Sequence, residues 1–184
     1  MARELPVERL RFPVGLVKAK NGELDPALLA TIKPYGRLYA TSAAIAWAEM
    51  RAEARKADVT LKPTSSFDTY RPLSVQTSVF LQRYSEKHIP GARVRRWNGK
   101  DYYQRPGVAM SAVPGTSNHG WGLAVDVWNV GQNGRLEWLL ENAKRFGFSW
   151  EVQSEPWHIR YVLGDDLPEG VQLPTATVDS EAPE

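Results

Sequence analysis

The chain of 184 residues contains no cysteine, which excludes disulfides, thiol nucleophiles and cysteine-based zinc sites. It also lacks an apolar run approaching the roughly 20 residues that a membrane-spanning helix needs, so no membrane span is predicted. The opening MARELPVERLRF has no apolar stretch after its basic residues and predicts no secretory signal. We therefore expect a protein made in the cytoplasm, which acts outside a cell only after another protein has released it.

Histidine is scarce, with three in the chain, and the acidic residues are unevenly distributed. Residues 165–184 contain six acidic residues, several prolines and no lysine or arginine, and we predict that they form a flexible tail. Residues 1–164 hold all 23 basic residues and the remaining 15 of the 21 acidic ones, and we predict a single domain there. Such a basic body suits an anionic polymer. The arginine-containing residues 93–105 match no recognisable nucleic-acid-binding motif, so we expect no nucleic-acid partner.

The order of the predicted elements indicates an α+β fold, with a small antiparallel sheet flanked by helices. Capping residues and apolar periodicity predict three helices: residues 41–57, a segment that starts at Pro72 and is stopped by Pro90, and residues 134–146. In the first of these, Ile45, Ala48 and Ala52 recur on one face. Alternating apolar residues predict strands over residues 122–128 and 158–163. Residues 92–120 are rich in turn formers and predict a long irregular connection.

Two short segments, SNHGWGLAVDVW and EPWHIRY, contain two of the three histidines, each near an acidic residue. His119 and Asp126 are seven residues apart in the first, and His158 follows Glu155 by three residues in the second. Two neutral imidazoles and one carboxylate bind Zn²⁺ at about 2.0–2.2 Å and leave a fourth position open. The metal lowers the pKa of a bound water to about 7, and Glu155, outside the ligand set, can take its proton. The segments therefore predict one zinc ion held by His119, Asp126 and His158.

Each of these residues also has a simpler explanation when it is taken alone. His119 suits a turn, Asp126 suits a buried acid bonded to backbone groups, and His158 suits the protein core. Gly120 and Gly122 allow tight backbone geometry, and we expect them to let the ligand loop approach a substrate closely. Taken as a set, two histidines that each lie in an acid-containing motif favour a metal site over three unrelated structural roles.

SNHGWGLAVD resembles the Ser-x-His-x-x-Gly-x-Ala-x-Asp signature of the D-Ala-D-Ala carboxypeptidase family, and EPWHIRY resembles its Glu-x-x-His signature. That family includes VanY-type peptidases and L-Ala-D-Glu phage endolysins, and it belongs with lysostaphin and sonic hedgehog to the LAS zinc peptidases. The resemblance covers roughly residues 40–163. It implies that His119, Asp126 and His158 are the zinc ligands and that Glu155 is the general base.

Further site residues are implied by the same resemblance. The segment FDTYRPLSVQ is similar to the family's Tyr-Arg-x-x-x-x-Gln segment, so Arg71 is expected to stabilise an oxyanion or to bind a substrate carboxylate. Gln76 is expected to support the same pocket, with helix packing as an alternative role. Ser117 is expected to line the site near the ligand loop while bonding local backbone. Trp157 is expected to form a wall of the cleft, with a core position as the alternative.

The resemblance implies a zinc-dependent peptidase that hydrolyses the peptide stem of peptidoglycan. Our first hypothesis is a phage endolysin-type L-Ala-D-Glu endopeptidase that acts on the cell wall as a monomer. The alternative is a D-Ala-D-Ala carboxypeptidase with the same fold and chemistry. A third hypothesis is a binding module that keeps the fold and metal without hydrolysing anything, although such a module has no need of Glu155 as a base.

Overall fold

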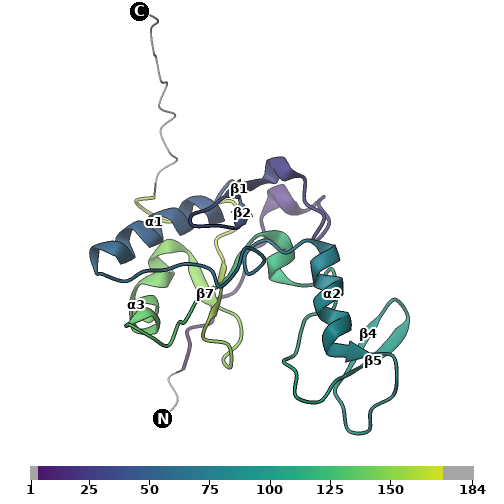
Figure 1. The fold of residues 1–184 in the computed structure, drawn as a ribbon. Coiled ribbons are helices and arrows are strands. Elements are labelled where there is room, and N and C mark those ends of the chain that lie inside the picture. The colour runs from purple at the N-terminus through teal and green to yellow at the C-terminus, as the bar shows by residue number, and fades with distance from the viewer. Residues whose placement is uncertain (1–3, 172–184) are drawn as a thin grey trace, which may run out of the picture.

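The computed structural model describes residues 4–171, and within them the chain adopts the predicted α+β fold (Figure 1). The α-helices are α1 (Ala43–Lys56), α2 (Leu73–Arg83) and α3 (Arg135–Asn142). Short strands form antiparallel sheets in the orders β1-β2, β3-β5-β4 and β6-β8-β7. The strands are β1 (Leu29–Thr31), β2 (Arg37–Tyr39), β3 (Tyr84–Ser85), β4 (Val94–Trp97), β5 (Lys100–Gln104), β6 (Ala124–Asp126), β7 (Phe148–Trp150) and β8 (His158–Tyr161).

The β6-β8-β7 sheet joins segments that are far apart in the sequence. β8 lies between β6 and β7, with His158 opposite Asp126 and with Ile159 opposite both Val125 and Trp150. Val125, Ile159 and Trp150 are all buried in the main hydrophobic core. Because side chains alternate along a strand, Asp126 and His158 share the other face of the sheet. The register of one strand pair therefore brings two of the predicted ligands together.

Helix α1 matches the predicted helix closely in its bounds but buries a different face. Trp47 and Met50 are fully buried, and the Trp47 ring packs edge-on against Phe148 of β7 with 6.0 Å between ring centroids. Ala48, on the face that the small residues suggested, is exposed. The difference has a physical cause, because burying tryptophan and methionine removes far more apolar area from water than burying alanine.

The segment after α2 differs from the prediction. The helix ends at Arg83 instead of continuing toward Pro90, and its last residue is followed directly by β3. The predicted irregular connection over residues 92–120 contains the β4–β5 hairpin, whose turn is made by Asn98 and Gly99 with φ of 49° and 77°. An Asn-Gly pair between strands is the preferred two-residue hairpin turn because both residues tolerate positive φ. The Asn-Gly pair is therefore a local signal for the hairpin. We overlooked this signal because the whole of residues 92–120 is rich in turn formers.

An aromatic cluster separate from the main core holds this hairpin against α2. Phe80 of α2, Tyr84 of β3 and Tyr102 of β5 are buried together, with Trp97 packed against them. The Phe80 ring stacks on Tyr84 with 4.7 Å between centroids and meets Tyr102 edge-on at 5.2 Å. Phe80 is in the last turn of α2 and Tyr84 is the first residue of β3. The cluster therefore spans the point where the helix ends and the strand begins.

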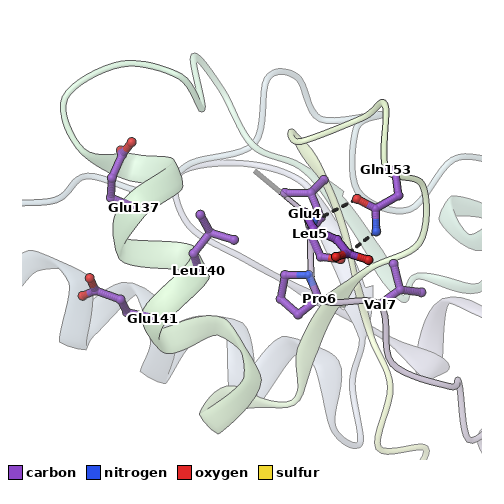
Figure 2. A pocket seen from close by; sticks show the side chains of 8 residues that line it. All are labelled: Glu4, Leu5, Pro6, Val7, Glu137, Leu140, Glu141 and Gln153. Atoms are coloured by element: carbon purple, nitrogen blue, oxygen red, sulfur yellow. Dashed lines mark hydrogen bonds between the residues drawn. The ribbon is translucent and has the colours of Figure 1, made fainter. Parts of the chain in front are cut away.

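Residues 4–35 precede the segment that resembles the family, yet they pack against its functional core. The Gly22 N–H donates a 2.8 Å hydrogen bond to the carbonyl of Gly120. Gln153, between β7 and β8, exchanges two hydrogen bonds with the backbone of Leu5, as Figure 2 shows. The N-terminal residues therefore support both the loop before β6 and the turn before β8.

The predicted tail falls mostly outside the described residues, because residues 172–184 are not among them. Its first residue, Asp165, accepts hydrogen bonds from the Val14 N–H and the Tyr39 hydroxyl, both at 2.7 Å. Over the part of the chain that the structure describes, no helix has both the length and the apolar character needed to cross a membrane.

Candidate metal centre

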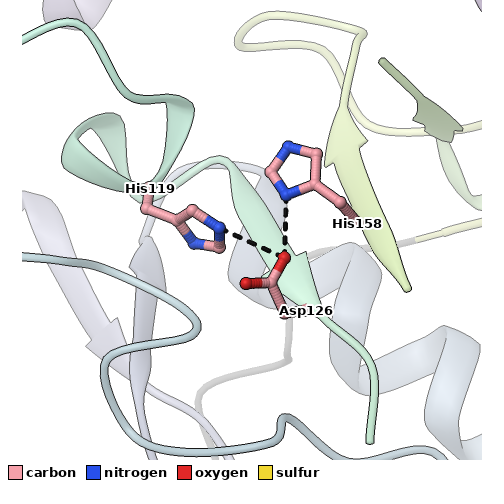
Figure 3. Close-up of side chains that lie close together, drawn as sticks. All are labelled: His119, Asp126 and His158. Carbon is pink, nitrogen blue, oxygen red and sulfur yellow. Dashed lines mark hydrogen bonds and ion pairs between the residues drawn. The ribbon is translucent and has the colours of Figure 1, made fainter. Parts of the chain in front are cut away.

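Three side chains from the two motif segments meet beside the paired strands β6 and β8 (Figure 3). His119 Nε2 is 3.3 Å from Asp126 Oδ1, and His158 Nδ1 is 2.8 Å from the same oxygen. The three potential ligand atoms all lie within 4.8 Å of one another. Two ligands of one tetrahedral ion with bonds of ~2.1 Å are roughly 3.4 Å apart, so the cluster fits a single metal ion. Imidazole nitrogen and carboxylate oxygen are both ligands that zinc accepts.

His119 lies on a short 3-10 turn, Asn118–Trp121, just before β6. The turn begins at Ser117, whose hydroxyl accepts a hydrogen bond from the His119 N–H at 3.3 Å. His119 is 3% exposed, and its Nδ1 lies 2.9 Å from the carbonyl oxygen of Thr69. An imidazole that donates its Nδ1–H to a carbonyl keeps Nε2 unprotonated, and Nε2 is the nitrogen that faces Asp126. The backbone of Thr69 thus orients the first histidine as a metal ligand.

Gly120 and Gly122 of this loop lie close against other segments of the protein. Gly122 ends the 3-10 turn with φ of 66°, and a Cβ there would lie 2.9 Å from the backbone nitrogen of Tyr39. A Cβ at Gly120 would collide with the side-chain oxygen of Asn21. The close approach that these glycines permit is to β2 and the N-terminal residues, which corrects our expectation of a close approach to substrate.

The electrostatics of the cluster favour a bound cation. Burial alone would raise the pKa of Asp126, but hydrogen bonds to the two imidazoles hold it well below its usual range. Burial lowers the pKa of His119. Burial would also lower the pKa of His158, yet Asp126 and Glu151 raise it to about 9. A metal ion therefore displaces a proton from His158 when it binds to the metal-free protein.

Arg71 lies where the prediction requires it, next to the cluster and just before α2. Its Nη2 is 3.0 Å from Asp68 Oδ1 and 3.7 Å from Asp126 Oδ2, and its side chain is 19% exposed. The Arg71 N–H donates a 3.0 Å hydrogen bond to the carbonyl of His119, so the arginine and the ligand loop are tied together. A guanidinium held this way has donors free for an anionic group beside the metal position. Its role in substrate binding stays a prediction.

Gln76 and Ser117 are close to the cluster but bond to the chain. Gln76 is 5% exposed, and its Nε2 donates to the carbonyl of Arg71 at 3.0 Å and to Asn21 Oδ1 at 3.1 Å. Its Oε1 accepts from the Gly115 N–H at 3.0 Å. These bonds favour the supporting role for Gln76 over direct contact with a substrate. Ser117 caps the turn that carries His119, in line with its predicted bonding to local backbone.

Glu155 and Trp157 lie in the turn that leads into β8. The Glu155 N–H donates to the carbonyl of Val152 at 3.1 Å, and the His158 N–H donates to the carbonyl of Glu155 at 3.0 Å. Within residues 4–171, no hydrogen bond or ion pair joins the Glu155 carboxylate to the three clustered side chains. It is thus outside the ligand set, and its role as the base stays a prediction. Trp157 is 42% exposed, which rules out the core position and leaves its indole available to a substrate.

Two acidic residues at the centre were missed by sequence reasoning. Glu151, directly after β7, is the carboxylate that contacts the outer nitrogen of His158. Asp68 holds the Arg71 guanidinium. Asp68 could have been found as an acid three residues before a predicted functional arginine. No local pattern marks Glu151, because its contact depends on the pairing of β7 with β8.

A hollow of about 670 Å³ lies between the N-terminal residues, α3 and Gln153, as shown in Figure 2. Carboxylates of Glu4, Glu137 and Glu141 are among its lining groups. None of the three clustered side chains lines it. It is therefore separate from the metal centre.

The α+β fold brings two imidazoles and a carboxylate together beside a half-buried arginine. This arrangement is typical of a metal-dependent hydrolase. Residues 37–164 match the family model described as VanY: D-alanyl-D-alanine carboxypeptidase. Because this match covers more than half of the chain, the protein belongs to the VanY family. The family predicted from the motifs is confirmed.

The chain is also similar to individual known proteins. A D-alanyl-D-alanine carboxypeptidase of Enterococcus faecalis is 31% identical over 137 residues, which are 62% of this chain and 51% of that protein. The chain thus spans about half the length of this relative. The solved structure of VanYB in complex with D-alanine-D-alanine is similar with a TM-score of 0.54 and 23% identity, over 86% of each chain. A mutant of the vancomycin resistance D,D-pentapeptidase VanY in complex with Zn(II) has a TM-score of 0.49 and 25% identity, over 73% of this chain and 78% of that one.

Proposed function

We propose that the protein is a zinc-dependent D,D-carboxypeptidase that removes the terminal D-alanine from peptidoglycan stem peptides. The observation that carries this proposal is the meeting of His119, Asp126 and His158 in a single cluster beside Arg71. Family membership supports the carboxypeptidase over the endolysin-type L-Ala-D-Glu endopeptidase that was our first hypothesis, because the matched family and the E. faecalis relative are both described as D-alanyl-D-alanine carboxypeptidases.

The donor set fits zinc, and three protein ligands leave a fourth position open, as in catalytic zinc sites. A zinc ion held by His119, Asp126 and His158 would supply Lewis-acid polarisation and would lower the pKa of water. Thr69 and Glu151 hold the outer nitrogens of the two imidazoles, so the ligand atoms stay turned toward Asp126.

Chain residues supply the remaining steps. Glu155, as a carboxylate outside the ligand set, accepts a proton from the attacking water and returns it to the departing D-alanine amine as the peptide C–N bond breaks. The Arg71 guanidinium, close to Asp126, offers paired donors to the free C-terminal carboxylate of the substrate or to the developing oxyanion. A free carboxylate is a feature of a carboxypeptidase substrate, which matches an arginine beside the centre.

The bond that is cleaved decides between the two peptidase hypotheses. Zinc-loaded protein is incubated with purified pentapeptide muropeptides, and the products are identified by mass spectrometry. We expect loss of one alanine and appearance of free D-alanine. A product with a new N-terminal D-glutamate would instead establish the endopeptidase, and the carboxypeptidase proposal would be wrong.

The substitution Glu155→Gln separates a catalyst from a module that only binds. We expect it to lower kcat by roughly 10²–10⁴-fold while zinc stoichiometry stays unchanged, because general acid–base catalysis contributes about that much. The surface variant Glu86→Gln, at the residue directly after β3, serves as the matched control and should keep full activity. Equal rates in wild type and Glu155→Gln would mean that another group is the base.

A further inference from the structure

The carboxylate of Glu151 lies behind the imidazole of His158, on the side away from the metal position. Glu151 Oε2 is 3.1 Å from His158 Nε2, while His158 Nδ1 is 2.8 Å from Asp126 Oδ1. We propose that Glu151 is a positioning residue for the metal centre, which keeps the proton of His158 on Nε2 and so leaves Nδ1 free to bind the ion. This inference rests on the proposed zinc centre and adds a residue that the family motifs do not contain.

The same carboxylate connects the two segments that carry the imidazoles. Its Oε2 also accepts a 2.7 Å hydrogen bond from the side-chain amide of Asn118, the residue next to His119. Its Oε1 is 3.2 Å from the Arg160 guanidinium, which shares a face of β8 with His158. One side chain thereby fixes the 3-10 turn before β6 relative to β8. The distance between the two histidine ligands therefore depends on Glu151.

The two imidazoles are held at their outer nitrogens by different kinds of group. His119 Nδ1 meets the backbone carbonyl of Thr69 at 2.9 Å, which no side-chain substitution removes. His158 Nε2 meets a carboxylate, and a carboxylate partner makes the imidazole a stronger ligand than a neutral acceptor does. Both Glu151 and Arg160 are partly shielded, with side chains 33% and 14% exposed, so water competes only in part for these bonds. His158 is therefore the ligand whose strength a single substitution can change.

The position of Glu151 argues against a direct part in the chemistry. The nitrogen that it contacts points away from Asp126 and His119, so its carboxylate has the imidazole ring between it and the open metal position. The Glu151 carboxylate therefore acts through His158, whereas Glu155 remains the candidate base. Removing Glu151 should weaken metal binding, and removing Glu155 should not.

Zinc affinity tests this inference without any assay of peptidase activity. Wild type, Glu151→Ala and Glu151→Gln are titrated with zinc in competition with a chromogenic chelator. We expect Glu151→Ala to weaken zinc binding about 10–100-fold, as loss of an outer partner of a metal-bound histidine does. Glu151→Gln keeps an acceptor oxygen for Nε2–H but loses the charge, so its affinity should lie between the two. Glu86→Gln is the matched control, because Glu86 likewise pairs with a cation, Lys100 at 2.8 Å, far from the centre, and its affinity should equal that of wild type.

A second readout follows the His158 proton directly, and the intermediate zinc affinity expected for Glu151→Gln keeps the test valid if Glu151→Ala folds poorly. In ¹⁵N-labelled, zinc-loaded protein, the His158 Nε2–H proton should be visible by NMR in wild type and in Glu151→Gln, and lost to exchange with water in Glu151→Ala. Zinc affinities within twofold of wild type in both variants, with the Nε2–H signal retained, would overturn the inference. Release of free D-alanine by wild type would leave the proposed function intact in that case. Conversely, Glu151-dependent zinc binding in a protein that cleaves no muropeptide would overturn the proposed function alone.

Discussion

The β6-β8-β7 sheet and the β3-β5-β4 sheet differ in how far apart in the sequence their paired segments lie. In the first, Asp126 and His158 are paired across 32 residues of sequence, and the N-terminal residues support the loops on both sides. In the second, β4 and β5 are joined by the two-residue Asn98-Gly99 turn, and their contacts are local. The three side chains of the candidate metal centre lie on the first sheet and on the 3-10 turn just before β6, and none of them lies on the second sheet.

This difference shows what each region needs from the rest of the chain. A centre built from distant segments depends on every element that fixes their separation, including β2 and residues near Asn21. The hairpin depends mainly on its turn and on the aromatic cluster around Phe80. Substitutions in the first region should therefore change metal binding, and those in the second should change local stability only.

The largest expected effect comes from removing a ligand of the long-range region. His119→Ala leaves two protein ligands, so the protein should lose its bound zinc and its peptidase activity together. Metal analysis of the purified variant by plasma mass spectrometry, with D-alanine release measured in parallel, checks this. His88→Ala, which removes the histidine outside the cluster, should retain both. If His119→Ala still bound one zinc ion per chain, the proposal that the region around β6 and β8 holds the metal would be wrong.

Gly120→Ala tests the support of the ligand loop by the N-terminal residues. The added methyl group would collide with the side chain of Asn21, so we expect a loss of about 1–3 kcal/mol in the free energy of unfolding, with weaker zinc binding. Urea unfolding and chelator competition measure the two quantities. At Gly131 a Cβ meets nothing within 4 Å, so Gly131→Ala is the matched control and should leave both unchanged. Equal behaviour of the two variants would mean that the loop is not packed as described.

Phe80→Ala tests the second region, the β3-β5-β4 sheet. Phe80 is fully buried and contacts Tyr84 and Tyr102, so its removal should destabilise the hairpin by roughly 3–5 kcal/mol. Amide hydrogen exchange should become faster in β4 and β5, while zinc affinity stays within twofold of wild type. A loss of zinc affinity as large as the one expected for Gly120→Ala would show that the two regions are coupled through α2.

The smallest expected effect is a pH dependence of the metal-free protein. The pKa of His158 is raised from 6.5 to about 9, so the folded state binds this proton more tightly than the unfolded chain. The resulting stability is fully present below about pH 6.5 and is lost as the pH rises through about 9. Thermal unfolding after EDTA treatment should therefore show the Tm falling by a few degrees over this range. In Glu151→Gln the fall should be smaller, and a Tm that rises with pH would contradict the assignment.

Much of the centre could be predicted because its chemistry is carried by side chains in short motifs. His119, Asp126 and His158 are recognisable by residue type and spacing, and the alternating apolar residues of 122–128 predicted the strand that carries Asp126. The contacts that orient these ligands were not predictable in the same way. Thr69 acts through its backbone carbonyl, and Glu151 reaches His158 only because β7 pairs with β8.

The errors in the fold prediction have local physical causes. α2 was expected to continue toward Pro90, but the aromatic cluster around Phe80 favours a strand from Tyr84 onward. The hairpin was hidden among turn formers, although its Asn98-Gly99 pair is a strong turn signal. The monomeric state and the release of the protein to the cell wall stay predictions.

Crystals of the zinc-loaded protein, measured at wavelengths on both sides of the zinc absorption edge, test the central claim directly. We predict a single anomalous peak ~2.0–2.2 Å from His119 Nε2, from His158 Nδ1 and from a carboxylate oxygen of Asp126. The Glu155 carboxylate should lie near that peak without coordinating it. A peak coordinated by other residues, or a cluster that stays without metal at saturating zinc, would contradict the account.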